Sequence, residues 1–495
     1  MIIKTDISEI QNYLVDAANY KGNCSAVYFP SSLDDITDII KKANDEKTHV
    51  TVSGNGTGLT GGRVPEGGIV VSTEKMNKIL EINEDEKFAV VQPGVLLSDF
   101  QKEISKLNLY YPPDPTEQEC FIGSTVATNA SGSKSFKYGS TRNFISELEI
   151  VLPTGEVIHL KRGDVKSSNG ILKLTTESGR EITLVLPNYK MPNTKHAAGY
   201  FVQNDMDAID LFIGAEGTLG IITKIKLRLL DKPQNILSSV IFFNEENDAL
   251  NFILEARKIS LNNRKLLNNE LDALALEFFD KNALEFLSAD YRNIPQSSHA
   301  AVWLEQEFTA ENEEKLFEQW TELIKQHKAD FESSWFAANQ KDRANFGEFR
   351  HAVSWKVNEY IALKNILKVG TDVAVPPTKF NELYFYSKTI VEESGLHYLS
   401  YGHFGDCHLH LNMLPHNDEE FKTAKNLYKQ VCSKAIELSG TISAEHGIGK
   451  LKREYLLMMF GEEGVKQMAK LKKQIDPNLI LNIGNIIDPV FYEKI

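Results

Sequence analysis

Apolar positions in the first third of the chain change their spacing several times, and each change predicts a new element. Residues 26–54 run from a short apolar segment into apolar positions at helical spacing and end in a β-branched segment, AVYFPSSLDDITDIIKKANDEKTHVTVSG. This order predicts strand, helix, strand. The short β-branched runs in GGIVVST, KILEIN and FAVVQPG predict further strands joined by tight turns. Together these elements predict a small mixed α/β lobe.

A second lobe is expected after the helical pattern LLSDFQKEISKLNL, which the prolines of YYPPDP end because proline cannot continue a helix. From Thr116 to about Lys232 the chain is strand-like and rich in glycine, as in IGSTVATNASGS, ELEIVLPTGEVIHL and GTLGIITKIKLRLL. LPTGEVI predicts a hairpin. Residues 161–193 add strands and turns for which the pattern gives no place.

The spacing changes again near Pro233, where long amphipathic segments such as NDALNFILEARKI and NEEKLFEQWTELIKQH predict helices. Gly440 follows another such segment, KTAKNLYKQVCSKAIELSG, and is expected to cap its helix. We therefore expect three parts: residues 1–232, residues 233–440 and a closing segment, residues 441–495. Because no repeat or low-complexity linker separates them, tight packing is expected.

Composition narrows the class of protein. With 495 residues, 42% hydrophobic and 25% charged, the chain predicts large globular domains, and no apolar run approaches a membrane span. The start MIIKTDISEI carries no leader pattern, so we expect a cytoplasmic protein with at most peripheral attachment to the inner face of the membrane. Four widely separated cysteines favour reduced thiols and no iron–sulfur centre: Cys24, Cys120, Cys407 and Cys432.

Charge argues against a polyanionic partner. Lys and Arg number 54 against 68 Asp and Glu, a net charge of −14, and no basic block stands out. Nucleic acid is therefore not an expected partner. An anionic substrate would have to be held by a local cation, because the overall field repels it.

Three stretches rich in Gly, Ser and Thr are candidates for a cofactor site. SGNGTGLTGG, residues 53–62, follows a strand and holds five glycines, whose backbone N–H groups could surround phosphate oxygens. It fits neither the Walker nor the G-x-G-x-x-G pattern, and alone it is equally a plain turn. Similar stretches at residues 122–143 and 214–222 favour an extended, phosphate-containing cofactor.

The stretch GHFGDCHLHLN, residues 402–412, concentrates three histidines, an aspartate and a cysteine. Alone it fits a metal site, a catalytic base with its neighbours or a polar loop. His410 and Asn412 are two apart, so on a strand both side chains would point to one face. His196, His351, His397 and His416, outside any such motif, are expected on the surface or in packing.

The motifs together resemble a known flavoprotein family. SGNGTGLTGG, PPDP, IGSTVATNASG, KYGSTRN and GAEGTLGII resemble the FAD-binding domain of the vanillyl-alcohol oxidase/PCMH superfamily. GHFGDCHLHLN, SAEHGIGKLKREYL and IDPNLILNIGNI resemble the C-terminal domain of its D-2-hydroxyacid dehydrogenase branch, which includes FAD-linked D-lactate dehydrogenase, the glycolate oxidase FAD subunit and D-2-hydroxyglutarate dehydrogenase. The resemblance implies an α+β fold: a PCMH-type FAD-binding domain of two α/β lobes, an α+β substrate-capping domain with an antiparallel sheet, and a C-terminal segment returning to the flavin.

The resemblance also implies which residues hold the cofactor. Because the first loop contains no histidine, we expect FAD to be noncovalent. The implied FAD residues are Gly54, Asn55, Gly56, Thr57, Gly58, Leu59, Pro113, Asp114, Gly123, Ser124, Ala127, Thr128, Asn129, Gly132, Tyr138, Gly139, Glu216, Gly217, Gly220, Ile221, Ile222 and Asn482.

By the same resemblance, His403, His410 and Glu445 match the ligands of a divalent metal. Two imidazoles and a carboxylate suit zinc, with iron or manganese as alternatives. His446 is expected to remove the substrate hydroxyl proton and Arg350 to hold the substrate carboxylate.

Asn412 is expected beside the substrate. Two departures from the family pattern stand nearby. The family usually shows Gly-Asp-Gly-Asn-Leu-His, where this chain has Cys407 and His408, and His408 could add a third imidazole. Relatives that take a larger diacid often carry Lys where this chain has Thr371, with Lys368 three residues earlier.

The implied reaction is oxidation of a D-2-hydroxy acid of the D-lactate, glycolate or D-2-hydroxyglutarate type to the 2-oxo acid. Electrons would pass to an acceptor other than NAD: a quinone, an electron-transfer flavoprotein, a cytochrome or an iron–sulfur partner. The alternatives are a non-redox FAD transferase resembling alkyldihydroxyacetonephosphate synthase and a flavin electron-relay subunit of a larger complex. A homodimer is left open.

Overall fold

A four-stranded sheet forms the first lobe. The computed structural model describes residues 1–268 and 270–495. Helix α2 (Leu33–Glu46) joins β2 (Ala26–Phe29) to β3 (Val50–Ser53), and β4 (Ile69–Ser72) lies between these strands and parallel to both, with β1 (Ile2–Lys4) at the edge. The Ser32 side chain caps α2 by accepting from the backbone N–H of Asp35. The predicted strand, helix, strand order is confirmed.

The second lobe is built on an antiparallel sheet in the order β5-β6-β12-β8-β9. These strands span Ile79–Asn83, Phe88–Val91, Ile221–Arg228, Ile145–Val151 and Val157–Lys161. The predicted hairpin is confirmed as β8–β9. Assigning KILEIN and FAVVQPG to the first lobe was wrong, because β6 pairs with β12, some 130 residues later. A local pattern predicts a strand but does not identify its distant partner.

Helix α4 (Ile122–Thr128) replaces the strand-like element expected in IGSTVATNASGS. Ile122, Thr125 and Val126 are buried, which is the i, i+3, i+4 spacing of a helix face. The β-branched residues that suggested a strand are those this face buries. Other short elements of the lobe are α3 (Leu97–Ser105), β7 (Leu109–Tyr110), α5 (Ser135–Tyr138), α6 (Ala208–Phe212) and β13 (Leu230–Asp231).

A seven-stranded antiparallel sheet forms the cap, in the order β17-β14-β16-β15-β20-β22-β18. In that order the strands span Asp330–Phe336, Asn235–Phe243, Ala300–Phe308, Ala275–Asp280, Tyr398–Gly402, Leu411–Met413 and Val369–Gly370. Along β14, Ile241 and Phe243 belong to one core cluster while Val240 and Phe242 belong to another. Successive strand residues point to opposite faces, so both faces of the sheet are covered.

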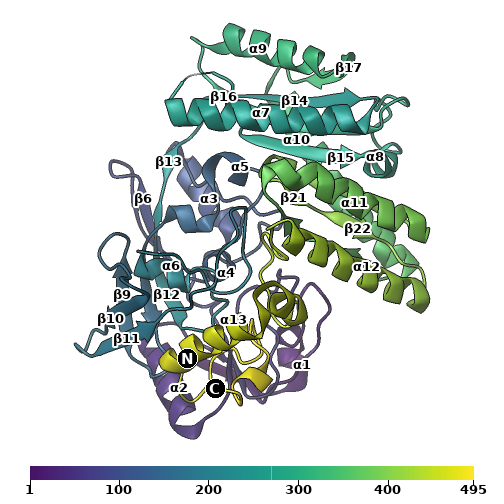
Figure 1. Cartoon of the computed structure of the whole chain (residues 1–495). Helices are drawn as coiled ribbons and strands as arrows, with labels where there is room; N and C mark the ends of the chain where they lie inside the picture. The colour runs from purple at the N-terminus through teal and green to yellow at the C-terminus, as the bar shows by residue number, and fades with distance from the viewer. Residues whose placement is uncertain (269) are drawn as a thin grey trace.

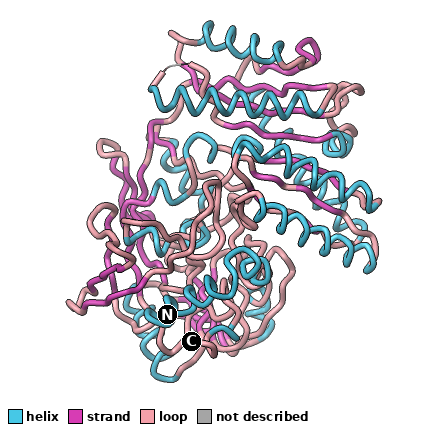
Figure 2. The backbone as a smooth tube through the Cα atoms, viewed as in Figure 1, coloured by secondary structure: helices cyan, strands magenta, loops and turns pink. Residues whose placement is uncertain are grey.

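Helix α7 (Glu246–Leu266) lies across β14 and β16, while α10 (Gln340–Lys364) packs in the opposite cluster, and Figure 2 shows the strands between helices. The helices predicted near residues 248 and 312 are confirmed as α7 and α9 (Glu313–Gln326). The remaining cap helices are α8 (Lys281–Leu287), α11 (Phe380–Ser394) and α12 (Asp418–Glu437). No helix among the described residues is both long and apolar enough to cross a membrane.

The predicted Gly440 cap of α12 is wrong. The left-handed residue after α12 is Ser439, with φ 63°. Gly440 is needed for a close approach instead, because a Cβ there would lie 2.2 Å from the Ala374 carbonyl oxygen.

The segment after residue 440, yellow in Figure 1, returns to the first lobe, where Leu481 forms a parallel bridge with Val50 of β3. Helix α13 (Arg453–Ile475) lies in this segment, and beyond it Asn482 accepts from the Val52 N–H at 2.8 Å. The hairpin of β10 (Ile171–Thr175) and β11 (Glu181–Val185) packs on α13, where the N–H of Val185 donates to Gln474 at 2.8 Å. This contact shows where residues 161–193 lie in the fold, which the sequence pattern did not predict.

Candidate active site

The loop after β3 borders a large cavity. No backbone N–H from residue 55 to residue 60 has a hydrogen-bond acceptor among the residues that the structure describes. Gly58 lines the cavity, and no atom lies within 4 Å of where its Cβ would stand. Including its open mouth, the cavity measures about 1650 Å³. Free N–H groups around such a space fit the pyrophosphate of an extended dinucleotide.

Most of the residues expected at FAD line this one cavity. They come from the loop after β3, from α4, from β12 and the turn that leads into it, and from the closing segment, which are far apart in sequence. Those in the lining are Gly54, Gly56, Thr57, Gly58, Leu59, Gly123, Ser124, Ala127, Thr128, Glu216, Gly217, Gly220, Ile221, Ile222 and Asn482.

The other expected FAD residues lie outside the lining and pack the loops. The Asn55 side chain donates to the Glu119 carbonyl, and Asn129 ends α4 in a left-handed conformation. Gly132 allows close approach to Asp114, since a Cβ there would lie 1.8 Å from the Asp114 carbonyl oxygen. The residues placed outside are Asn55, Pro113, Asp114, Asn129, Gly132, Tyr138 and Gly139.

Glu216 connects the second lobe to the closing segment. Its carboxylate accepts from the N–H groups of Ile448 at 2.6 Å and Gly449 at 2.7 Å. Its carbonyl oxygen accepts from the Asn482 side chain at 2.8 Å. Burial raises the pKa of Glu216 to about 7, against these backbone donors. The residue thus holds the loop that carries Glu445 and His446 against the cavity wall.

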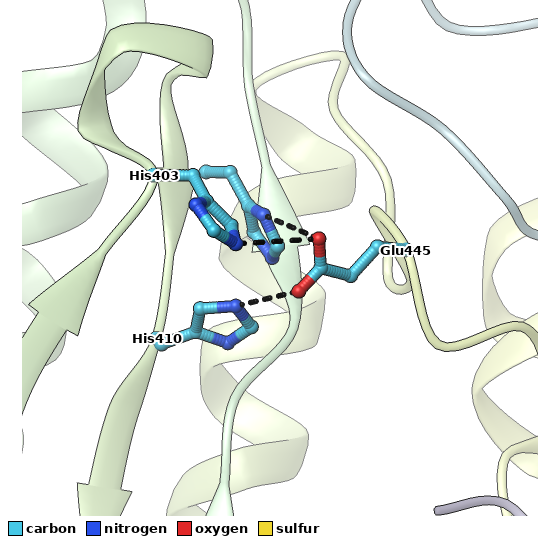
Figure 3. A group of neighbouring side chains, drawn as sticks. His403, His410 and Glu445 are labelled. Carbon is cyan, nitrogen blue, oxygen red and sulfur yellow. Dashed lines mark hydrogen bonds and ion pairs between the residues drawn. The ribbon is translucent and has the colours of Figure 1, made fainter. Parts of the chain in front are cut away.

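His403, His410 and Glu445 converge although they come from two separate segments. Nε2 of His403 lies 3.4 Å from one Glu445 oxygen, and Nε2 of His410 lies 3.1 Å from the other (Figure 3). His403 follows β20, and His410 lies between β21 (His408–Leu409) and β22. His403, Glu445 and His446 also line the cavity of the glycine-rich loops.

Each of these two imidazoles is oriented from behind by an acceptor. Nδ1 of His403 lies 2.8 Å from Glu277, and Nδ1 of His410 lies 3.0 Å from the Thr371 carbonyl. Because these oxygens only accept, Nδ1 carries the proton and Nε2 can turn a lone pair toward a metal. The donor set therefore fits a divalent ion. Burial lowers the pKa of His403, but Glu277 and Glu445 outweigh it and raise the pKa to about 9, so a bound metal would have to displace the proton on Nε2.

Arg350 is not in the cavity lining. Its guanidinium donates twice to Glu277, at 3.1 and 2.9 Å, and once to Thr116 at 3.3 Å. Glu277 holds His403, so Arg350 acts on the cluster through that carboxylate. Only its contact with Thr116, a lining residue, points toward the cavity.

His446 lies beside the cluster with its ring stacked on His410, at 5.5 Å between centroids. Its Nδ1 is 3.3 Å from Asp372 and its Nε2 is 3.6 Å from Glu445. Burial lowers the pKa of His446 to about 4 despite Asp372, so the imidazole is neutral at pH 7.

Asn412 is buried, and its Nδ2 has no hydrogen-bond partner among the described residues. His408, His410 and Asn412 alternate along an extended segment, which places them on one face. Lys368 and Asn412 both approach Gly370, whose Cβ position lies 3.9 Å from Lys368 and 2.8 Å from Asn412. A free amide and a lysine thus lie near one another.

Several residues that build the cluster were not predicted from the sequence. Lys195 places its ammonium 2.9 Å from Glu445, and the Ser131 hydroxyl donates to the same carboxylate at 3.0 Å. Glu277 and Asp372 are the buried carboxylates behind the histidines. A signal existed for Glu277, a lone charge within the apolar run ALALEFF, whereas Lys195 falls in a stretch with no readable pattern.

The fold is of the PCMH type. The solved structure of p-cresol methylhydroxylase aligns over 98% of this chain and 94% of its own, with a TM-score of 0.70 and 16% identity. A 4-ethylphenol oxidase from Gulosibacter chungangensis aligns over the same shares, with a TM-score of 0.69 and 20% identity. At these identities the likeness concerns the fold.

Two family descriptions match the chain, an FAD binding domain at residues 24–161 and the C-terminal domain of FAD linked oxidases at residues 245–486. D-lactate dehydrogenase of Anaerostipes hadrus is 32% identical over 92% of this chain and 88% of its own. Glycolate oxidase subunit GlcD of Bacillus subtilis is 30% identical over 96% and 91%, and D-2-hydroxyglutarate dehydrogenase of Stutzerimonas stutzeri 29% over 98% and 96%. The chain belongs to the family of FAD-linked oxidases.

Proposed function

We propose that the protein oxidises a D-2-hydroxy acid to the 2-oxo acid and passes the electrons to an acceptor other than NAD. The observation that carries the proposal is the shared cavity, lined at one part by the glycine-rich loops and at another by His403, Glu445 and His446. A substrate between them would face both a hydride acceptor and a base. The names of the relatives favour the D-lactate, glycolate or D-2-hydroxyglutarate type of substrate.

FAD would lie noncovalently in this cavity, since the loop at residues 53–62 contains no histidine. When bound, FAD supplies the two-electron acceptor for the hydride that leaves C2 of the substrate. The free N–H groups of residues 55–60 would hold its pyrophosphate, and the turn before β12 would line its remaining length.

His403, His410 and Glu445 would hold a divalent metal, zinc or alternatively iron or manganese. When bound, the metal supplies positive charge that lowers the pKa of a hydroxyl beside it. Glu277 and the Thr371 carbonyl keep the two imidazoles turned inward, and Lys195 balances the Glu445 charge.

His446 would take the hydroxyl proton at Nε2. The Asp372 carboxylate lies 3.3 Å from Nδ1 and keeps the N–H proton of the neutral imidazole on that atom. The Nε2 lone pair is therefore free. Asn412 lies on the same face as His410, and its Nδ2 has no partner within the part of the chain that the structure describes, so we place it beside the substrate carboxylate. Arg350 would act chiefly through Glu277.

Anaerobic reduction of the bound flavin tests this function. D-lactate, D-2-hydroxyglutarate, the L-isomers of both and achiral glycolate are each mixed with purified protein. The yellow flavin should bleach with the D-acids or glycolate only. Bleaching by none of them would overturn the dehydrogenase function. Turnover with an artificial acceptor dye would exclude a pure electron-relay role, and net substrate oxidation would exclude a transferase.

A further inference from the structure

His408 stands where the related motif has asparagine, and its surroundings are those of a metal ligand. The residue is fully buried, and its Nδ1 has no hydrogen-bond partner among the described residues. That nitrogen lies 4.0 Å from a Glu445 oxygen, the same oxygen that His403 approaches. An unpaired buried nitrogen is costly unless something occupies its lone pair.

The opposite nitrogen fixes the tautomer of His408. Nε2 lies 2.9 Å from the Asp372 carboxylate, which can only accept, so Nε2 carries the proton and Nδ1 presents a lone pair. His403 and His410 are arranged alike, each with one N–H toward an acceptor behind it and the other nitrogen toward Glu445. Such backing is typical of histidine metal ligands.

The distances also suit one ion. One ligand atom each from His403, His408, His410 and Glu445 can be chosen so that all lie within 4.8 Å of one another. Ligands bound at about 2.1 Å stand at most about 4.2 Å apart, so a contraction of roughly half an ångström closes the set. The rings of His408 and His410 lie 4.1 Å apart, side by side on one face.

We propose that His408 is a fourth protein ligand, through Nδ1, which makes the site three imidazoles and one carboxylate. This inference rests on the metal site proposed above and extends it. An ion limited to four ligands would then have no open coordination position for a substrate oxygen. The site would therefore take an ion that accepts five or six ligands, and three imidazoles favour zinc, cobalt, nickel or iron over magnesium and calcium.

Cobalt binding tests the ligand count without relying on turnover. Chelator-treated protein is titrated with Co²⁺ as the only added metal, and its affinity for the ion is measured by competition with a chelator. X-ray absorption then counts the imidazoles around the bound ion. The wild-type protein should show three, and His408→Asn should show two with affinity lowered at least about tenfold. His397→Asn, which removes an exposed histidine, should match the wild type in both measurements.

The outcomes separate the two proposals. Wild-type affinity in His408→Asn, or two imidazoles in the wild-type protein, would overturn the role of His408 and leave the three-ligand site standing. No Co²⁺ uptake by the wild-type protein would overturn both. The X-ray absorption count on the wild-type protein decides the question even if His408→Asn does not fold.

Discussion

The carboxylate of Asp372 lies 3.3 Å from Nδ1 of His446 and also accepts the backbone N–H of that residue at 3.1 Å. The same carboxylate accepts from the N–H of Glu445 at 3.2 Å and from the Lys452 ammonium at 2.6 Å. One buried group therefore sets the orientation of the ring and the position of the loop that carries it. The proposed ligand and the proposed base are adjacent residues, so this single anchor positions both.

Replacing His446 with Gln should slow flavin reduction by a D-2-hydroxy acid about 10²–10⁴-fold, the usual contribution of a positioned base. Glutamine preserves much of the side-chain volume but cannot take the proton. Stopped-flow absorbance under anaerobic conditions measures the rate, and flavin absorbance after gel filtration measures retained FAD. His397→Asn is the control. Loss of FAD in step with the rate would show a structural role instead.

Replacing Glu277 with Gln should weaken metal binding about 10–100-fold, because His403 loses the carboxylate that orients it. Competition with a chromogenic chelator measures the affinity. The melting temperature should fall as well, since the buried Arg350 loses its ionic partner. Glu285→Gln, at an exposed position, is the matched control. Unchanged affinity in Glu277→Gln would contradict the orienting role.

Local signals in the sequence were sufficient to predict most elements and to single out the motif residues that we propose as the site. The loop after β3 and the histidines of residues 402–412 were readable because glycine runs and clustered ligands have direct chemical meaning. The pairing of strands could not be predicted, because β6 pairs with β12, which is far from it in sequence. In IGSTVAT, β-branched residues on a buried helix face imitated a strand.

The supporting residues were harder to predict for the same physical reason. Glu277 and Asp372 are important because their carboxylates lie behind histidines of the cluster. A single sequence does not show that these residues are close in space. Arg350 was expected to face a substrate, yet burial gives it Glu277 as a partner. The residues that we propose to contact a ligand belong to motifs, whereas the residues that orient them are distributed over the fold.

Removing the metal should abolish flavin reduction by the substrate while FAD stays bound, because the histidine cluster and the loop of residues 53–62 are separate parts of the cavity. Dialysis against a chelator, followed by metal analysis and anaerobic mixing with the best substrate, measures both. Adding back Zn²⁺, Mn²⁺, Fe²⁺ and Co²⁺ separately should restore the rate with at least one ion. Full activity in metal-free protein would contradict the metal proposal.

Asp280 should make stability depend on pH in a direction opposite to that of most carboxylates. Burial raises its pKa to about 8, one oxygen caps α8 by accepting from the Ala283 N–H, and the other has no hydrogen-bond partner among the described residues. The folded state therefore keeps a proton that the unfolded chain releases above its ordinary pKa of 3.8. The free energy of unfolding then falls as pH rises from about 4 to about 8, by up to about 1.4 kcal/mol per pH unit.

Asp280→Asn removes this titration and keeps an oxygen for the cap. Its melting temperature should exceed that of the wild-type protein, and by more at pH 7.5 than at pH 5, because the wild-type penalty grows with pH. Thermal unfolding followed by circular dichroism at both pH values measures the difference, with the exposed Asp85→Asn as control. An equal change at the two pH values would mean that Asp280 does not hold its proton in the folded protein.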